Sequence, residues 1–365
     1  MAKIAFLSFY SGFVERGVET YVYELAMRLA KKHDVTVFQG GKSHLWYSKA
    51  RTSQGKFKVI DFNCIGSTSK SANSFLRIFY LDRWSLKILI FSLKAAFKVA
   101  RGKYDLVIPM NGGWQTVIYR LFSKFRNFKI LISAQAGIGR DDGWNLFWKP
   151  DIFVALTKAE EKWANRFAPE VRTALIPNGV DLFKFNPKVS PKKLTLKTPI
   201  VVCAAALDSY KRVDLTIKAV AKSQNLSLLL LGDGDSRGNI DALGKRLLGS
   251  RYLRLLVPHS EIPGYFRAGL VFSLASKTEA FGTSYIEAMA CNLPIVATYD
   301  SSRQEIIGDA GILTNPEDVD QYAKDLMLAA SANYRNRPYN QALKFSWNKI
   351  AERYEKVIAS LLKRQ

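Results

Sequence analysis

Two glutamates with a defined spacing are the clearest candidates for chemistry. Glu279 and Glu287 lie eight positions apart, the first in a loop after an apolar strand and the second in the first turns of a helix that Thr283 or Ser284 could cap. A carboxylate accepts hydrogen bonds from adjacent hydroxyls, and Gly282 lets the backbone amides at the helix start approach a phosphate. The segment indicates a site for a phosphorylated sugar. The alternative is two surface glutamates that flank a tight turn.

The elements that must position these groups form two series of short apolar strands alternating with helices. We expect strands at 4–9, 35–38, 58–62, 106–109, 130–133, 152–155 and 174–176, then at 199–204, 227–231, 253–257, 270–274 and 295–297. Helical segments follow at 319–330, 340–345 and 347–362. This alternation predicts an α/β fold with parallel sheets covered on both faces. We expect two doubly wound domains, residues 1–185 and 186–365, that bind ligands at the carboxyl ends of their strands.

Length and composition fit this organisation. The chain has 365 residues, of which 48% are apolar and 23% charged, so apolar surface is ample for two cores. No apolar run is long enough to cross a membrane, and the first residues read as a strand rather than a signal peptide. The three cysteines have neither metal-binding spacing nor an even disulfide set, so we expect a reducing, cytoplasmic location.

Positive charge is concentrated in one quarter of the chain. The formal net charge is +23, and residues 41–130 hold 17 lysines and arginines against three acidic residues. Residues 81–102 combine apolar residues at helical spacing with Lys87, Lys94 and Lys98, which is typical of a helix that lies on an anionic membrane. The alternative is a solvated helix whose apolar side packs on a sheet. No nucleic-acid-binding motif accompanies the charge, so we expect no nucleic acid partner.

The segment with the two glutamates resembles the E-x7-E signature of the retaining glycosyltransferases of family 4, which have the GT-B fold. Other motifs similar to that family are Arg16-Gly17-Val18-Glu19, Ile176-Pro177-Asn178-Gly179-Val180-Asp181, Gly232-Asp233-Gly234 and Gly308-Asp309-Ala310-Gly311. Asn292 replaces the family's usual Gly, and Asn tolerates the left-handed conformation of that turn. The resemblance covers about residues 3–330. It implies two Rossmann-like domains facing across a cleft, with the C-terminal helices packing back toward the N-terminal domain.

The resemblance also implies which residues bind the substrates. The acceptor is expected in residues 1–185 and the nucleotide-sugar donor in residues 186–365. Glu279 is expected to bind hydroxyls of the donor sugar, Glu287 the ribose, and Lys211 the diphosphate, where a fixed cation stabilises the leaving group. Further substrate contacts are expected from residues in or near the motifs, namely Arg16, Gly17, Gln135, Asp141, Arg212, Gly232, Phe281, Gly282, Thr283 and Ser284.

Two further positions, both expected near the reacting groups, depart from the family pattern. Ala206 replaces an Arg that normally accompanies the Lys, and Arg212 or Arg16 could compensate. Gln135 replaces a His that faces the reacting centre, and since Gln cannot take a proton it could only orient hydroxyls. Asp141 or the adjacent Asp142, in a loop bounded by glycines, could approach the acceptor hydroxyl as a base. The alternative for these two aspartates is a solvated or capping pair.

These observations lead to one expected function and two alternatives. We expect sugar transfer from a nucleotide-diphospho-sugar, itself a substrate, to a hydroxyl of a saccharide or lipid-linked acceptor. The transfer would proceed with retention and without metal or cofactor, in cell-surface polysaccharide or glycolipid assembly, with peripheral contact of residues 41–130 to an anionic membrane. The alternatives are a nucleotide-sugar epimerase of similar fold and a catalytically inactive relative that binds polyanions or membranes.

Overall fold

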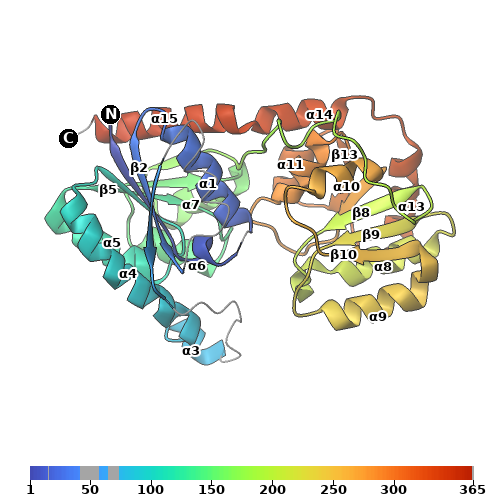
Figure 1. The fold of residues 1–365 in the computed structure, drawn as a ribbon, viewed down its shortest axis with the longest axis horizontal. Coiled ribbons are helices and arrows are strands. Elements are labelled where there is room, and N and C mark those ends of the chain that lie inside the picture. Colours follow the sequence, from blue (N-terminus) through green and yellow to red (C-terminus); the bar gives the residue numbers. More distant parts are fainter. Residues whose placement is uncertain (15, 42–56, 65–73, 364–365) are drawn as a thin grey trace. The chain divides into compact units, whose positions relative to one another are not determined.

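The computed structural model divides into two compact units and describes residues 1–14, 16–41, 57–64 and 74–363 (Figure 1). Unit 1 comprises Met1–Pro177 and Asn348–Gln365, and unit 2 comprises Asn178–Trp347. The boundary predicted from the sequence lay at residue 185 and left the whole C-terminal region in the second domain. The units instead divide at Pro177, and the last helix belongs to unit 1, because its apolar face is buried there.

Unit 1 contains a seven-stranded parallel sheet with the strand order β3-β2-β1-β4-β5-β6-β7. The five strands inside this sheet are short runs in which nearly every residue is buried, as both faces of a covered parallel sheet require, whereas the two edge strands are more exposed. Their bounds are β1 (Lys3–Ser8), β2 (Asp34–Gly40), β3 (Lys58–Phe62), β4 (Leu106–Pro109), β5 (Lys129–Ser133), β6 (Ile152–Ala155) and β7 (Thr173–Leu175).

Helices cover both faces of this sheet. They are α1 (Gly17–Leu29), α3 (Ser74–Ile78), α4 (Arg83–Gly102), α5 (Trp114–Arg126), α6 (Arg140–Phe147), α7 (Lys158–Phe167) and α15 (Trp347–Leu362). The strand order places α1 on one face and α4 with α5 on the other, as Figure 1 shows. Helix α15 packs on the face of α1, where the Tyr354 hydroxyl lies 2.9 Å from that of Tyr21 and 3.3 Å from Oγ of Ser133.

Unit 2 contains a six-stranded parallel sheet with the strand order β10-β9-β8-β11-β12-β13. Its strands are β8 (Ile200–Ala204), β9 (Ser227–Leu231), β10 (Tyr252–Leu255), β11 (Val271–Leu274), β12 (Ile295–Thr298) and β13 (Gly311–Thr314). The chain direction along the sheet reverses between β8 and β11. This reversal leaves a switch point at the carboxyl ends of those two strands, where sheets of this type bind ligands.

The helices of unit 2 also form two layers. Helices α8 (Val213–Lys222), α9 (Arg237–Leu248) and α13 (Val319–Ser331) pack together on one face. The other face carries α10 (Ile262–Ala268), α11 (Thr283–Ala290), α12 (Ser301–Ile307) and α14 (Arg337–Ala342). The predicted fold class, an α/β chain with two doubly wound parts, is therefore confirmed. Among the described residues, none of the helices is long and apolar enough to cross a bilayer.

Two local predictions have different outcomes. Asn292 has a φ of +65°, so the left-handed turn expected at this residue is confirmed. The loop expected around Asp141 and Asp142 is wrong, because both residues lie in the first turn of α6. Acidic residues are favourable there, since the N-terminus of a helix carries partial positive charge.

Candidate functional site

The predicted donor-site residues gather at the carboxyl edge of the unit 2 sheet. Lys211 follows β8 and Glu279 follows β11, so the two lie on either side of the switch point. Gly232 follows β9, and Thr298 ends β12. Residues 68 positions apart in the sequence thus come together because parallel strands end at the same edge.

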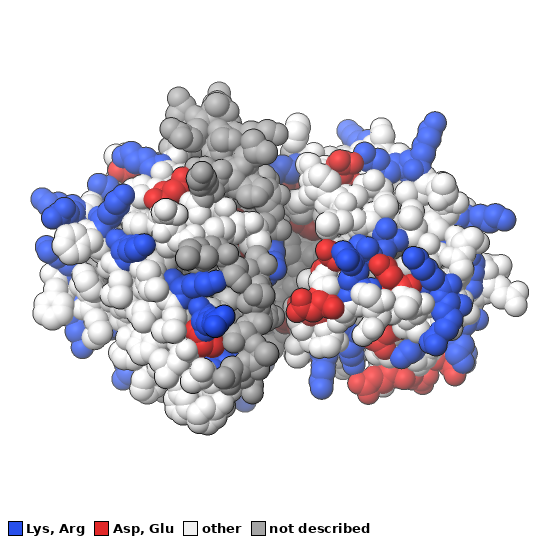
Figure 2. Space-filling view, turned by 60° about the horizontal axis from the view of Figure 1, so that its bottom comes forward, with Lys and Arg blue, Asp and Glu red and all other residues white. Residues whose placement is uncertain are grey.

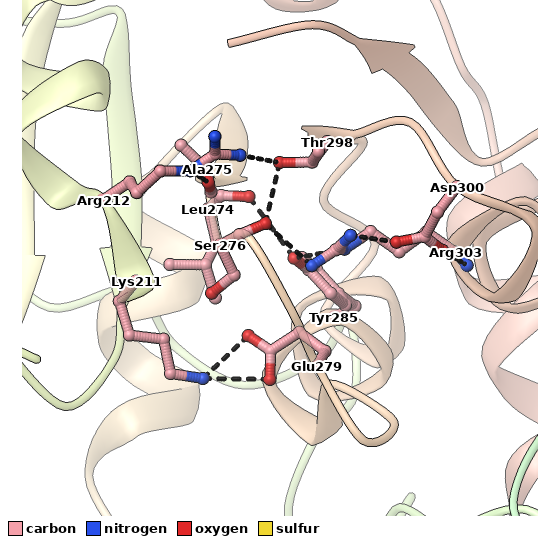
Figure 3. A network of polar contacts seen from close by, with 10 residues as sticks. All are labelled: Lys211, Arg212, Leu274, Ala275, Ser276, Glu279, Tyr285, Thr298, Asp300 and Arg303. Carbon is pink, nitrogen blue, oxygen red and sulfur yellow. Dashed lines mark hydrogen bonds and ion pairs between the residues drawn. The ribbon is translucent and has the colours of Figure 1, made fainter. Parts of the chain in front are cut away.

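Lys211 and Glu279 form an ion pair (Figure 3). The Nζ atom of Lys211 lies 2.7 Å from Oε1 and 2.9 Å from Oε2 of Glu279. Only 13% of the Lys211 side chain and 11% of the Glu279 side chain are exposed. Each charge therefore compensates the other in a partly dry environment, and the loss of one would leave the other poorly solvated.

Arg212 points away from this pair and joins the ends of two strands (Figure 3). Its Nε donates to the carbonyl oxygen of Ala275 at 2.7 Å, and its Nη2 donates to Oγ1 of Thr298 at 3.2 Å. Its Nη1 lies 2.9 Å from a carboxylate oxygen of Glu317. These partners hold the edge of the sheet together. The proposed compensation of the missing Arg by Arg212 stays a prediction.

Arg303 fixes the loop that carries Glu279. The residue is 1% exposed, and its Nη2 donates to the carbonyl oxygen of Ser276 at 2.8 Å. It also pairs with Asp300, and its Nε lies 3.3 Å from the Tyr285 hydroxyl (Figure 3). The network ties the loop after β11 to α11 and α12. Arg303 could not be predicted as a site residue, because nothing in the segment Ser301–Ile307 distinguishes a buried Arg from a solvated one.

The turn into α11 differs from the predicted cap. Gly282 is the N-cap with a φ of +83°, and a Cβ there would lie 2.4 Å from the Tyr285 ring. Neither Thr283 nor Ser284 is the cap, so that prediction is wrong; both are half-buried residues of the first turn. Because Gly282 has no side chain to cap the first amides of α11, this helix start suits an anionic ligand. Phe281 is 3% exposed and packs against Phe345, so it anchors the turn to the protein interior.

Glu287 has a partner that the sequence did not reveal. Its Oε1 lies 2.8 Å from Nε2 of His259, and its side chain is 10% exposed. His259 follows β10, and its ring lies 5.4 Å from the ring of Phe185. The signal that could have found it is its place just after an apolar strand, the same place that Lys211 and Glu279 occupy.

Gly232 lies in a turn that accepts no other residue. Its φ is +146°, and a Cβ there would lie 1.9 Å from the carbonyl oxygen of Ala205. The turn therefore brings the backbones after β8 and β9 into direct contact. At this position the backbone of Gly232, and not a side chain, lies next to the loop after β8.

The predicted residues of unit 1 lie at the carboxyl edge of its sheet. Arg16 is the exposed N-cap of α1, and its backbone N–H donates to Oε2 of Glu19 at 3.2 Å. Gly17 is the first residue of that helix and is also exposed. Gln135 follows β5, and its Nε2 donates to Oγ of Ser133 at 3.0 Å. The Gln135 amide is thereby oriented by the strand end.

Asp141 and Asp142 have opposite environments. Asp141 is exposed and accepts a hydrogen bond from the Tyr80 hydroxyl at 2.9 Å. Asp142 is buried and accepts from the Ala136 N–H and from Nδ2 of Asn145. Burial raises the pKa of Asp142 to about 7, although these donors oppose the shift. Of the two predicted bases, Asp141 is the one with access to a ligand, whereas Asp142 holds the loop before α6.

The described residues contain no cluster of three or more His, Cys, Asp or Glu side chains arranged to hold a metal ion.

Several curated proteins and solved structures are similar to this chain in sequence or in fold. The D-inositol 3-phosphate glycosyltransferase of Corynebacterium jeikeium (strain K411) is 26% identical over 215 residues, 51% of each chain. The alpha-monoglucosyldiacylglycerol synthase of Acholeplasma laidlawii is 33% identical over 159 residues, 39% of this chain and 40% of the relative. The chain thus matches about half or less of the length of these curated relatives. The solved structure of Anabaena Alr3699/HepE in complex with UDP and glucose has a TM-score of 0.76, 19% identity, and coverage of 99% and 100%.

Two doubly wound units, the second inserted before the last helix of the first and with its switch-point residues gathered at one sheet edge, define a GT-B glycosyltransferase fold. Residues 16–183 match the family model described as Glycosyltransferase Family 4, and residues 186–345 match the one described as Glycosyl transferases group 1. The chain belongs to glycosyltransferase family 4, and the resemblance stated from its motifs is confirmed.

Proposed function

We propose that this protein transfers a sugar from a nucleotide-diphospho-sugar to an acceptor hydroxyl, with retention at the anomeric carbon. The observation that carries the proposal is the Lys211–Glu279 pair at the switch point of unit 2. A cation and a carboxylate in contact, in a site with little water, match a ligand that carries both a diphosphate and sugar hydroxyls. Unit 2 would then hold the donor, and unit 1 the acceptor.

Each charged group has a distinct role in this proposal. When the donor binds, the Lys211 ammonium moves from Glu279 to the diphosphate. The Glu279 carboxylate can then accept hydrogen bonds from the donor sugar hydroxyls. The uncapped amides of α11 bind phosphate oxygens, and Glu287, oriented by His259, binds the ribose hydroxyls. Arg303 acts indirectly, because it fixes the loop that carries Glu279.

The proposed reaction needs no nucleophile from the enzyme. The acceptor oxygen forms a bond to the anomeric carbon on the face from which the phosphate oxygen departs, and the bond between that carbon and oxygen breaks. The acceptor proton passes to the departing phosphate oxygen, and Lys211 stabilises the negative charge that develops there. We expect no metal, since Lys211 can meet the phosphate charge, and no cofactor, since the nucleotide sugar is itself a substrate. Undiminished transfer in the presence of a chelator is the corresponding measurement.

The acceptor is proposed to belong to polysaccharide or glycolipid assembly. Two relatives are named for transfer to an inositol phosphate and for synthesis of a glucosyldiacylglycerol. Unit 1 offers Asp141 and the oriented amide of Gln135 to acceptor hydroxyls.

Peripheral membrane contact is part of the proposal and rests on α4. Leu86, Ile90, Leu93 and Phe97 form an exposed apolar stripe at helical spacing, while the opposite side of the helix is buried. Lys94 and Lys98 are exposed on the same helix. The other basic residues of 42–56 and 65–73 lie outside the described residues. We expect weaker sedimentation with anionic vesicles after loss of the charges of Lys87, Lys94 and Lys98, and unchanged sedimentation would contradict the contact.

The function is tested by donor binding and then by turnover. Thermal unfolding with UDP, GDP, ADP and their sugars identifies the donor, because a ligand of the folded state raises Tm. Glu279→Gln is expected to keep nucleotide binding and lose transfer, whereas Lys211→Met loses both. Lys218→Met, which breaks an exposed pair with Asp214, is the matched control. Full transfer by Glu279→Gln would refute the assigned role, and product formed from donor alone would indicate epimerisation instead.

A further inference from the structure

A pocket of about 230 Å³ opens at the carboxyl end of β5 in unit 1. It is lined by residues 136–141 and by Arg77 of α3. Gly137 and Gly139 have φ values of +82° and +157°, and a Cβ on Gly139 would meet no atom within 4 Å. Backbone therefore forms much of the wall and leaves the space open. Since a water molecule occupies about 30 Å³ in the liquid, the volume suits a small polar head group.

Two arginines, Arg77 and Arg140, are among the residues that line this pocket. Nη2 of Arg140 donates to the carbonyl oxygens of Arg77 and Ile78 at 2.5 and 2.8 Å, and its guanidinium lies 4.5 Å from the centre of the Tyr80 ring. These contacts fix the Arg140 side chain and leave some of its five N–H donors for a ligand. Within the described parts of the chain, neither Arg140 nor Arg77 forms an ion pair with a carboxylate.

Asp141 completes the polar lining with an acceptor. Its Oδ1 accepts from the Tyr80 hydroxyl, and Asp141 lines the pocket together with the two arginines. A ligand that satisfies all three groups carries an anionic oxygen for the arginines and a hydroxyl for the carboxylate.

The surroundings of the pocket are apolar and exposed. Phe75, Leu76, Ile78 and Phe79 of the α3 segment are 39–66% exposed, and Ile138 in the pocket wall is 54% exposed. The apolar stripe of α4 follows in the chain. Figure 2 shows the described part of this face as mostly white, with separate blue side chains and few red ones. Single exposed apolar residues are ordinary, but a group of them beside basic residues marks a surface for an apolar and anionic partner.

We propose that this pocket binds the head group of an anionic membrane lipid that bears both a phosphodiester and free hydroxyls, and that this lipid is the acceptor. The proposal rests on the proposed function, because it presupposes that unit 1 binds the acceptor. The phosphodiester lies between Arg77 and Arg140, a head-group hydroxyl donates to Asp141, and the acyl chains stay in the membrane against α3. The lipid is then glycosylated without leaving the bilayer.

The test compares vesicles of equal charge and different head groups. Phosphatidylcholine vesicles receive equal mole fractions of phosphatidylglycerol, whose head group has two hydroxyls, or of phosphatidylserine, whose head group has none. The full chain is expected to sediment preferentially with the phosphatidylglycerol vesicles. Arg77→Ala is expected to weaken binding to phosphatidylglycerol about tenfold and to abolish the preference. Arg140→Lys keeps the charge but loses the planar fork, and is expected to reduce the preference too.

Lys94→Ala is the matched control, because Lys94 is exposed on α4 and is not among the residues that line the pocket. It is expected to weaken binding to both vesicle types equally. If Arg77→Ala behaves in the same way, the pocket contributes only unspecific charge and the proposal is wrong. If inorganic phosphate or glycerol 3-phosphate raises the Tm of wild type but not of Arg77→Ala, and neither lipid is preferred, the ligand is a soluble phosphate and the lipid assignment is overturned.

Failure of this proposal can be told apart from failure of the proposed function. Donor binding depends on unit 2, so the Tm shift caused by the nucleotide is expected to be the same in wild type and Arg77→Ala. Absence of any nucleotide-induced shift in the wild type refutes the transferase proposal. A normal nucleotide shift without a head-group preference refutes only the acceptor site.

Discussion

The Lys211–Glu279 pair allows a quantitative test through a double-mutant cycle. Lys211→Met leaves the Glu279 carboxylate without its partner at 11% exposure. A fully buried unpaired charge costs about 3–5 kcal/mol, so for this partly exposed pair we expect a loss of about 2 kcal/mol. Glu279→Gln leaves a lysine whose flexible stem can carry the ammonium to water, and the expected loss is about 1 kcal/mol. The double variant restores most of the stability, because it removes both charges.

The assay is urea unfolding of the four proteins, supported by Tm. A loss of about 2 kcal/mol corresponds to a fall in Tm of roughly 4–8 °C for a unit of this size. Lys218→Met, at a pair whose side chains are 44% and 40% exposed, is expected to change stability by less than about 0.5 kcal/mol. A coupling energy between Lys211 and Glu279 no larger than that control would refute the reasoning that the two charges depend on each other in a partly dry site.

Three further predictions concern the loops around the donor site and a buried carboxylate in unit 1. Gly232→Ala is expected to lower the free energy of unfolding by about 3 kcal/mol or more, since its Cβ would lie 1.9 Å from a carbonyl oxygen. The control Gly238→Ala, in open space within α9, is expected to raise the free energy of unfolding by about 0.5–1 kcal/mol. Equal urea midpoints for the two variants would contradict this reasoning. Arg303→Met is expected to lower the free energy of unfolding by about 3 kcal/mol and to weaken the nucleotide-induced Tm shift, because the Ser276 carbonyl and Asp300 lose their partner. An unchanged shift would show that Arg303 does not position the loop that carries Glu279. Burial raises the pKa of Glu160 to about 8, so the folded state holds a proton that the unfolded chain releases above about pH 4.3, and wild-type stability falls as pH rises from there toward 8. Glu160→Gln should flatten that fall, and an unaltered slope of Tm against pH would contradict the assignment.

Site residues could be predicted from the sequence where they directly follow an apolar strand. Lys211 and Glu279 could be predicted as neighbours, because each follows an apolar strand and such strands end together in a parallel sheet. Arg303 could not, since its burial depends on the carbonyl of Ser276 and on Asp300, which only the folded chain brings around it. The predicted cap of α11 failed because Gly282 turns the chain through a left-handed conformation and needs no side-chain oxygen.

The apolar pattern of α4 shows a second limit. One apolar side of the helix packs on unit 1 as the pattern indicates, through residues such as Ile88, Phe91 and Val99. The other side, from Leu86 to Phe97, is exposed, and periodicity alone does not say which apolar residues face the core. The sequence placed the basic helix correctly but left open which of its apolar residues are exposed.

The division of the chain has a consequence for biosynthesis. Unit 1 is interrupted by the whole of Asn178–Trp347 before α15 completes it. A ribosome adds roughly 5–20 residues per second, so α15 is synthesised on the order of ten seconds or longer after β7. During that interval unit 2 can finish folding, while the Tyr21 hydroxyl and the apolar face around it lack the cover of Tyr354. The nascent first unit therefore exposes, during this interval, apolar surface that α15 buries in the complete chain.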